Sequence, residues 1–141
     1  MTWTAAATFA AVAVTLYAGH QVADHVLGQT DRQACQKAKP GRAGWRANLA
    51  HVGLYHLVVA AMLAVAWWVL GLPLSGWGVA VGLGFSAVTH AFLDRRWPVR
   101  AILRATGSAP FAETAQGMYL ADQALHYGCL WVSALLMVGL S

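Results

Sequence analysis

Residues 57–70 read LVVAAMLAVAWWVL, and this stretch decides the class of the protein. It is apolar on every face of a helix, whereas a surface helix of a soluble protein has one polar face. Each of four stretches reaches the ~20 apolar residues that cross a bilayer as a helix: residues 3–27, 47–70, 74–93 and 118–140. Of the 141 residues, 59% are hydrophobic and 10% charged, against about a quarter charged in soluble domains. We therefore predict an all-α integral membrane protein, a single domain over residues 1–141 folded as a four-helix bundle.

The basic residues predict the orientation of this bundle. All nine Lys and Arg lie in two segments, one between spans one and two and the other between spans three and four. The positive-inside rule places both segments in the cytoplasm, so both termini are predicted to be extracytoplasmic. No basic residue precedes the first apolar stretch, so we expect that span to be retained rather than cleaved as a signal peptide. Tryptophans are expected at both membrane interfaces: Trp67, Trp68 and Trp77 outside, Trp45 and Trp97 inside.

The second basic segment has the pattern of a short amphipathic helix. Arg96, Arg100 and Arg104 follow one another at single-turn spacing, and Pro98 stands near the start. We predict an interfacial helix that is stopped by Gly107, with the three arginines on anionic lipid headgroups. A solvated basic loop is the alternative. The net charge of +4 is thereby assigned to the membrane surface, and nucleic acid is not an expected partner.

Histidine and aspartate recur in the apolar stretches at helical spacing. The pairs His20–Asp24, His90–Asp94 and Asp122–His126 are each four residues apart, which places both members on one face of a helix. Given the predicted orientation, these pairs and His51 share one depth near the cytoplasmic side. Ionisable residues inside a membrane are energetically unfavourable and usually functional.

Imidazole and carboxylate together are ligands for zinc, iron or manganese. We therefore predict a site for a divalent metal, zinc in the first place, with one ion or two. The candidate ligands are His20, Asp24, His51, His90, Asp94, Asp122 and His126. Polar residues on the same helical faces are expected to orient these ligands by hydrogen bonds: Tyr17, Asn48, Tyr55 and Tyr119. His25 and His56 point away by helical angle and are expected to bond a neighbouring helix or the headgroup region.

A metal in this setting can acidify bound water and supply hydroxide. The resulting hypothesis is hydrolysis of a membrane-associated or lipid-linked substrate. Two alternatives stay open: a non-catalytic His–Asp network that stiffens the bundle, and an ion or proton conduit. The outer halves of the spans carry few polar residues, which counts against a conduit. Cys35 and Cys129 lie at different predicted depths, so no disulfide is expected.

The ordered motifs resemble those of an uncharacterised family of small bacterial multi-pass membrane proteins. The segments are HQVADHVLGQ at 20–29, HAFLD at 90–94, DRRWP at 94–98 and DQALH at 122–126; the third is typical of an actinobacterial branch. This resemblance implies a multi-pass protein of the bacterial cell membrane. A looser likeness, in motif style, links the chain to membrane-bound metal-dependent hydrolases and implies a divalent metal and a hydrolytic reaction.

Overall fold

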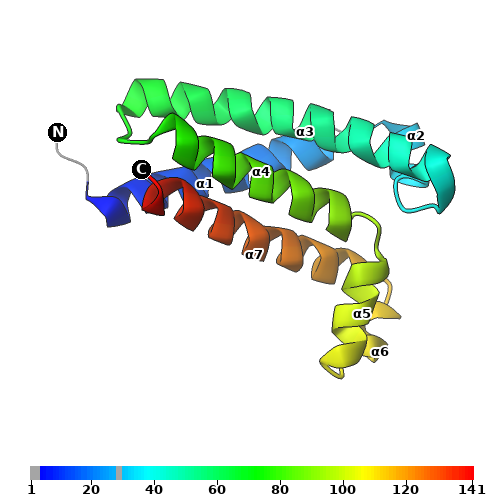
Figure 1. Cartoon of the computed structure of the whole chain (residues 1–141). Coiled ribbons are helices and arrows are strands. Elements are labelled where there is room, and N and C mark those ends of the chain that lie inside the picture. The colour runs from blue at the N-terminus through cyan, green and yellow to red at the C-terminus, as the bar shows by residue number, and fades with distance from the viewer. Residues whose placement is uncertain (1–3, 28–29) are drawn as a thin grey trace.

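The structure, a computed structural model, describes residues 4–27 and 30–141, and these residues form helices joined by turns, with no strand among them. The prediction of an all-α fold is therefore confirmed. Four long helices make up most of the chain (Figure 1): α1 Ala5–Val22, continued by a π-helical turn η1 Ala23–Leu27, then α3 Gly41–Leu70, α4 Gly76–Leu93 and α7 Gly117–Gly139. Three short helices complete it: α2 Asp31–Gln36, α5 Trp97–Ala105 and α6 Ala109–Ala112.

Three of the long helices are long and apolar enough to cross a membrane: α1 with η1, α3 and α4. The predicted start of the first span, Trp3, lies outside the described residues. Helix α7 has the required length, 23 residues, but Asp122, Gln123 and His126 in its first half make it more polar. Helix α3 begins at Gly41, earlier than the predicted start near residue 47, so much of the expected inner loop is helical.

The four long helices form a ring of neighbours. Helix α1 packs on α3 and α7, and α4 packs on the same two helices, so α1 and α4 lie across the ring from each other. Helix α1 begins and α7 ends beside the α3–α4 turn, and the short helices α2, α5 and α6 lie at the opposite end (Figure 1). Each long helix therefore runs antiparallel to its neighbours in the ring.

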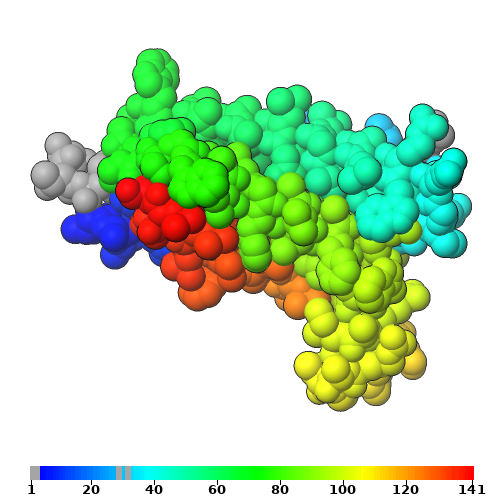
Figure 2. Space-filling model, viewed as in Figure 1, coloured from blue at the N-terminus to red at the C-terminus, as the bar shows by residue number. Residues whose placement is uncertain are grey.

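The second basic segment is helical, as α5, Trp97–Ala105, and is not a loop. Pro98 lies in its first turn, and Gly107 follows it with a left-handed φ of +74°, a common way to end a helix. Arg96 precedes it with φ +60° and turns the chain away from α4. Helices α5 and α6 stand out from the side of the molecule (Figure 2). The segment 109–116 contains the four-residue helix α6 and otherwise turns.

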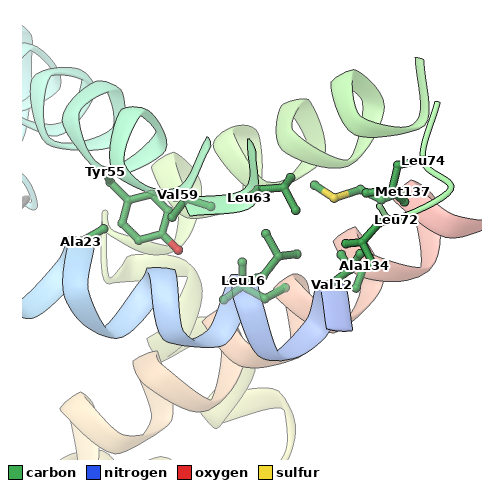
Figure 3. Packing of buried hydrophobic residues seen from close by; sticks show 11 residues of the cluster. Val12, Leu16, Ala23, Tyr55, Val59, Leu63, Leu72, Leu74, Ala134 and Met137 are labelled. Atoms are coloured by element: carbon green, nitrogen blue, oxygen red, sulfur yellow. The ribbon is translucent and has the colours of Figure 1, made fainter. Parts of the chain in front are cut away.

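An apolar core fills the end of the ring near the α3–α4 turn (Figure 3). Leu16 of α1 lies opposite Val59 and Leu63 of α3, and all three are at most 1% exposed. Farther along, Ala134 and Met137 of α7 are completely buried and belong to the same cluster. Polar groups are thereby left to the other end of the ring.

Helices α4 and α7 approach closely at Gly82. A Cβ atom added there would lie 2.3 Å from Met137 Cγ and 2.9 Å from the Ser133 carbonyl oxygen. The Ser133 hydroxyl in turn donates a hydrogen bond to the Gly82 carbonyl. At Gly84, by contrast, an added Cβ would meet open space. Small residues let membrane helices pack backbone to backbone. Of Gly82 and Gly84, only Gly82 has this role.

We expect Gly82→Leu to lower the stability of the protein by about 1–3 kcal/mol, because the added side chain must force α4 and α7 apart. Gly84→Leu is the matched control, since it adds the same side chain to the same helix where there is room. Thermal unfolding of the purified variants in detergent measures the difference. Equal melting temperatures for the two variants would contradict the packing described for Gly82.

Candidate metal centre

Polar side chains gather in the half of the ring away from the apolar core. The ring centroids of His90 and His126 are 4.5 Å apart, those of His51 and His90 5.3 Å, and those of His20 and His126 5.7 Å. Six of the seven predicted ligands converge here, each at most 5% exposed: His20, Asp24, His51, His90, Asp94 and His126. All four long helices contribute, counting η1 with α1 and Asp94 as the C-cap of α4.

Three ligand atoms in this cluster form a nearly equilateral triangle. His51 Nε2 is 3.2 Å from His90 Nε2 and 3.4 Å from Asp94 Oδ2, and His90 Nε2 is 3.3 Å from the same Asp94 oxygen. Ligands about 2.0 Å from a tetrahedrally coordinated zinc ion lie about 3.3 Å from one another. The triangle therefore has the dimensions of one face of a zinc coordination tetrahedron.

Unpaired acceptors point to the same region. Asp24 Oδ1, Asp94 Oδ2 and His126 Nε2 are buried and have no hydrogen-bond partner among the described residues. Yet Asp24 Oδ1 lies 3.0 Å from His51 Nε2. At this distance the two atoms can share one proton or bind a common cation. Buried acceptors without well-aligned partners are unfavourable, and a bound cation is one way to satisfy them.

Two overlapping groups in the cluster could hold a metal ion: Asp24, His51 and His90, and also His90, Asp94 and His126. Within each group the ligand atoms lie within 4.8 Å of one another. His90 belongs to both groups. Asp24 reaches the cluster from η1, where the wider π-helical turn replaces ordinary helical spacing after His20; such turns are frequent at functional sites.

His126 is held in the orientation of a metal ligand. Its Nδ1 donates a hydrogen bond of 2.8 Å to the carbonyl oxygen of Asp122, which leaves Nε2 without a proton and 4.0 Å from Asp94 Oδ1. Ligating histidines commonly fix their second nitrogen in this way. The Asp122 carboxylate stays beside its own helix, 3.8 Å from His126 Nδ1. Asp122 is thus the predicted ligand that the structure does not bring to the triangle.

His20 uses both ring nitrogens for hydrogen bonds. Nδ1 accepts from the Tyr55 hydroxyl at 2.9 Å, and Nε2 donates to Gln123 Oε1 at 2.9 Å. The Gln123 amide then donates to Asp24 Oδ2 at 3.3 Å. His20 also lies in a third possible metal group, with Asp24 and the exposed His25. Because both of its ring nitrogens already make hydrogen bonds, His20 is better placed to orient Asp24 through Gln123 than to bind a metal ion.

Of the residues predicted to orient the ligands, Tyr55 does contact one of them. Asn48 instead donates to the Ala91 carbonyl at 3.2 Å and ties α3 to α4. Tyr17 and Tyr119 are half-exposed, and the Tyr119 hydroxyl lies 3.4 Å from His25 Nε2. Both tyrosines lie at the edge of the cluster.

His56 fits the expected bond to a neighbouring helix. Its Nδ1 donates to the Val52 carbonyl at 2.8 Å, and its Nε2 lies 3.1 Å from the Ser86 hydroxyl of α4. His25 lies closer to the cluster than its helical angle suggested, with Nδ1 4.0 Å from Asp24 Oδ2. Its exposure still sets it apart from the buried ligand atoms.

Sequence reasoning missed Gln123 and Lys37. Gln123 is a polar residue inside an apolar stretch, a signal that the sequence does contain. In the sequence, Lys37 is one of the basic residues between spans one and two and no motif marks it. In the structure its ammonium lies 2.9 Å from Asp94 Oδ1, 3.2 Å from His51 Nε2 and 3.8 Å from Asp24 Oδ1. Burial alone would raise the pKa of the Asp94 carboxyl, but His90 and Lys37 beside it hold that pKa below its ordinary value. Asp94 therefore stays ionised and available to a cation.

Comparison with family models, curated proteins and solved structures gives no match for this chain. The geometry of the cluster is therefore the basis for the proposed function.

We expect Gln123→Leu to destabilise the protein by about 1–3 kcal/mol, because it leaves buried groups of both His20 and Asp24 without their partner. Gln21→Leu is the control: Gln21 lies on α1, bonds the Tyr127 hydroxyl and does not touch the triangle. Unfolding in detergent by urea, followed by circular dichroism, compares the two. A smaller effect at Gln123 than at Gln21 would refute the bridging role.

Proposed function

We propose that this protein is a four-span protein of the bacterial cell membrane that holds one zinc ion near the cytoplasmic face and hydrolyses a membrane-associated substrate. The observation that carries the proposal is the triangle of His51 Nε2, His90 Nε2 and Asp94 Oδ2. Three protein ligands leave one coordination position for water, as in catalytic zinc sites, whereas structural zinc sites are closed by four ligands.

The proposed topology follows from where the charges lie. The basic segments that contain α2 and α5 lie at the end of the molecule where α1 and α4 finish and α3 and α7 begin (Figure 1), and the candidate ligands lie in those parts of the long helices. The positive-inside rule places this end in the cytoplasm and both termini outside, with α7 as the fourth span. The polar start of α7 then faces the cluster, and Arg96, Arg100 and Arg104, all exposed, reach the headgroup level beside it.

The chemistry follows from the ion and its neighbours. A zinc ion lowers the pKa of bound water to near 7 and supplies hydroxide as a nucleophile. Asp24, 3.0 Å from the His51 corner, is placed to take up the proton of that water. We propose a single ion, because the group with His126 reuses both His90 and Asp94 of the triangle and offers no separate set of ligands.

A metal-free structural network is the second candidate, and one observation favours it. The two nitrogens of His51 and His90, 3.2 Å apart, could share one proton, and Lys37 already lies beside both buried carboxylates. A conduit is less favoured, because Leu16, Leu63 and Met137, each at most 1% exposed, fill the outer half of the ring.

Metal content separates the two candidates. Purified in the presence of zinc and then dialysed, the wild-type protein is expected to retain about one zinc ion per chain. His90→Ala should lower zinc affinity by more than the roughly 10–100-fold typical of groups that only support a ligand. His56→Ala removes another buried histidine of the same region and should leave zinc content unchanged. Elemental analysis of the three proteins measures this, and wild-type protein without zinc would leave the structural network as the better account.

Asp24→Asn tests whether the site is open for catalysis. If Asp24 acts as the base, the variant keeps its zinc but loses about 10²–10⁴-fold in turnover. The readouts are elemental analysis and the hydrolysis of a p-nitrophenyl phosphodiester presented in detergent micelles. Loss of zinc from this variant would instead make Asp24 a fourth ligand, and the closed site would then be structural.

A further inference from the structure

The proposed function gives Lys37 no task, although its ammonium lies against the cluster. Its ammonium is 3.2 Å from the His51 corner of the triangle, whereas an ion bound by the triangle would lie about 2.0 Å from each corner. Lys37 therefore borders the ion position and does not occupy it. It also holds Asp94 Oδ1 at 2.9 Å while Asp94 Oδ2 forms the third corner.

The position of Lys37 is fixed by its surroundings. The buried guanidinium of Arg95 donates hydrogen bonds to the carbonyl oxygens of both Lys37 and Lys39 and lies over the ring of Trp45, 4.6 Å from its centroid. At Gly44 an added Cβ would be 1.8 Å from the Lys39 carbonyl oxygen, so the glycine lets the loop lie against α3. Arg95, which follows Asp94, and Gly44, near the start of α3, thus clamp the loop that carries the Lys37 ammonium.

The charges of the site call for an anion. Among the groups within 4 Å of the triangle, Asp24 and Asp94 carry two negative charges, which a divalent ion balances; the Lys37 ammonium, 2.9 Å from Asp94 Oδ1, then adds one positive charge beside the ion. An uncompensated buried charge is strongly unfavourable, and a lysine ammonium is a common partner for phosphate oxygens. A neutral carboxylic ester would leave this charge unbalanced.

We propose that the substrate is a phosphate ester, with one phosphoryl oxygen on the metal ion and another on the Lys37 ammonium. This inference rests on the proposed function and names its substrate class. In the reaction, the oxygen of the metal-bound water forms a bond to phosphorus and the bond from phosphorus to the alcohol oxygen breaks. One proton of the water passes by way of Asp24 to the departing alcohol, and the other stays on the phosphate product.

The test uses the full-length protein in detergent, loaded with cobalt(II), whose visible spectrum reports changes in its ligands. Inorganic phosphate is titrated into the wild type, Lys37→Gln, Lys37→Arg and Lys39→Gln. We expect phosphate to shift the spectrum of the wild type and of Lys39→Gln with the same dissociation constant. Lys37→Gln should bind cobalt normally but need at least about tenfold more phosphate, and Lys37→Arg should lie between them.

Each failure has its own signature. A wild-type protein that binds no cobalt overturns the proposed function and this inference with it. If cobalt binds but phosphate leaves the wild-type spectrum unchanged, or acts equally on Lys37→Gln, the inference alone is overturned. Loss of cobalt from Lys37→Gln also overturns it, because Lys37 would then serve the ion itself.

A parallel titration with dihexanoylphosphatidic acid identifies the source of the phosphate. A lower dissociation constant than for inorganic phosphate supports a lipid phosphate ester. Equal constants support a soluble phosphate ester that reaches the site from the cytoplasm.

Discussion

Two carboxylates buried within one apolar ring set the constraint on which the rest of the structure depends. Asp24 and Asp94 both lie within 4 Å of the Lys37 ammonium and of His51, and neither is more than 5% exposed. Such charges persist in a low-dielectric interior only when cations and hydrogen bonds surround them. The clamped loop, the π-helical turn and the polar start of α7 all supply such groups to the two carboxylates.

The apolar half of the ring makes that arrangement possible. Interlocking side chains such as Leu16 and Leu63, together with the close approach of α4 and α7 at Gly82, fix the helices relative to one another mainly through apolar contacts. Ligand atoms from α3 and α4 can then be held within a few tenths of an ångström of equal spacing. A rigid apolar scaffold beside a polar site is what precise metal geometry requires.

The sequence was sufficient to predict the helices, their apolar character and the meeting of most of the polar residues, because helical periodicity and hydrophobicity are local signals. It could not predict whether Asp122 or Gln123 would reach the cluster. The two residues are adjacent on α7, and only the rotation of that helix in the ring decides which one faces Asp24. The place of Lys37 in the cluster could not be predicted for another reason. Its position depends on bonds from Arg95, 58 residues away in sequence, and no spacing rule encodes such a contact.

The triangle of ligand atoms lies entirely on α3, α4 and the cap of α4, two consecutive helices joined by the short turn at Gly71. This has a consequence for biogenesis. A chain is synthesised from its N-terminus, so the hairpin that carries His51, His90 and Asp94 is complete before α7 is made. These three ligand atoms can therefore meet before His126 and Gln123 arrive to complete the cluster.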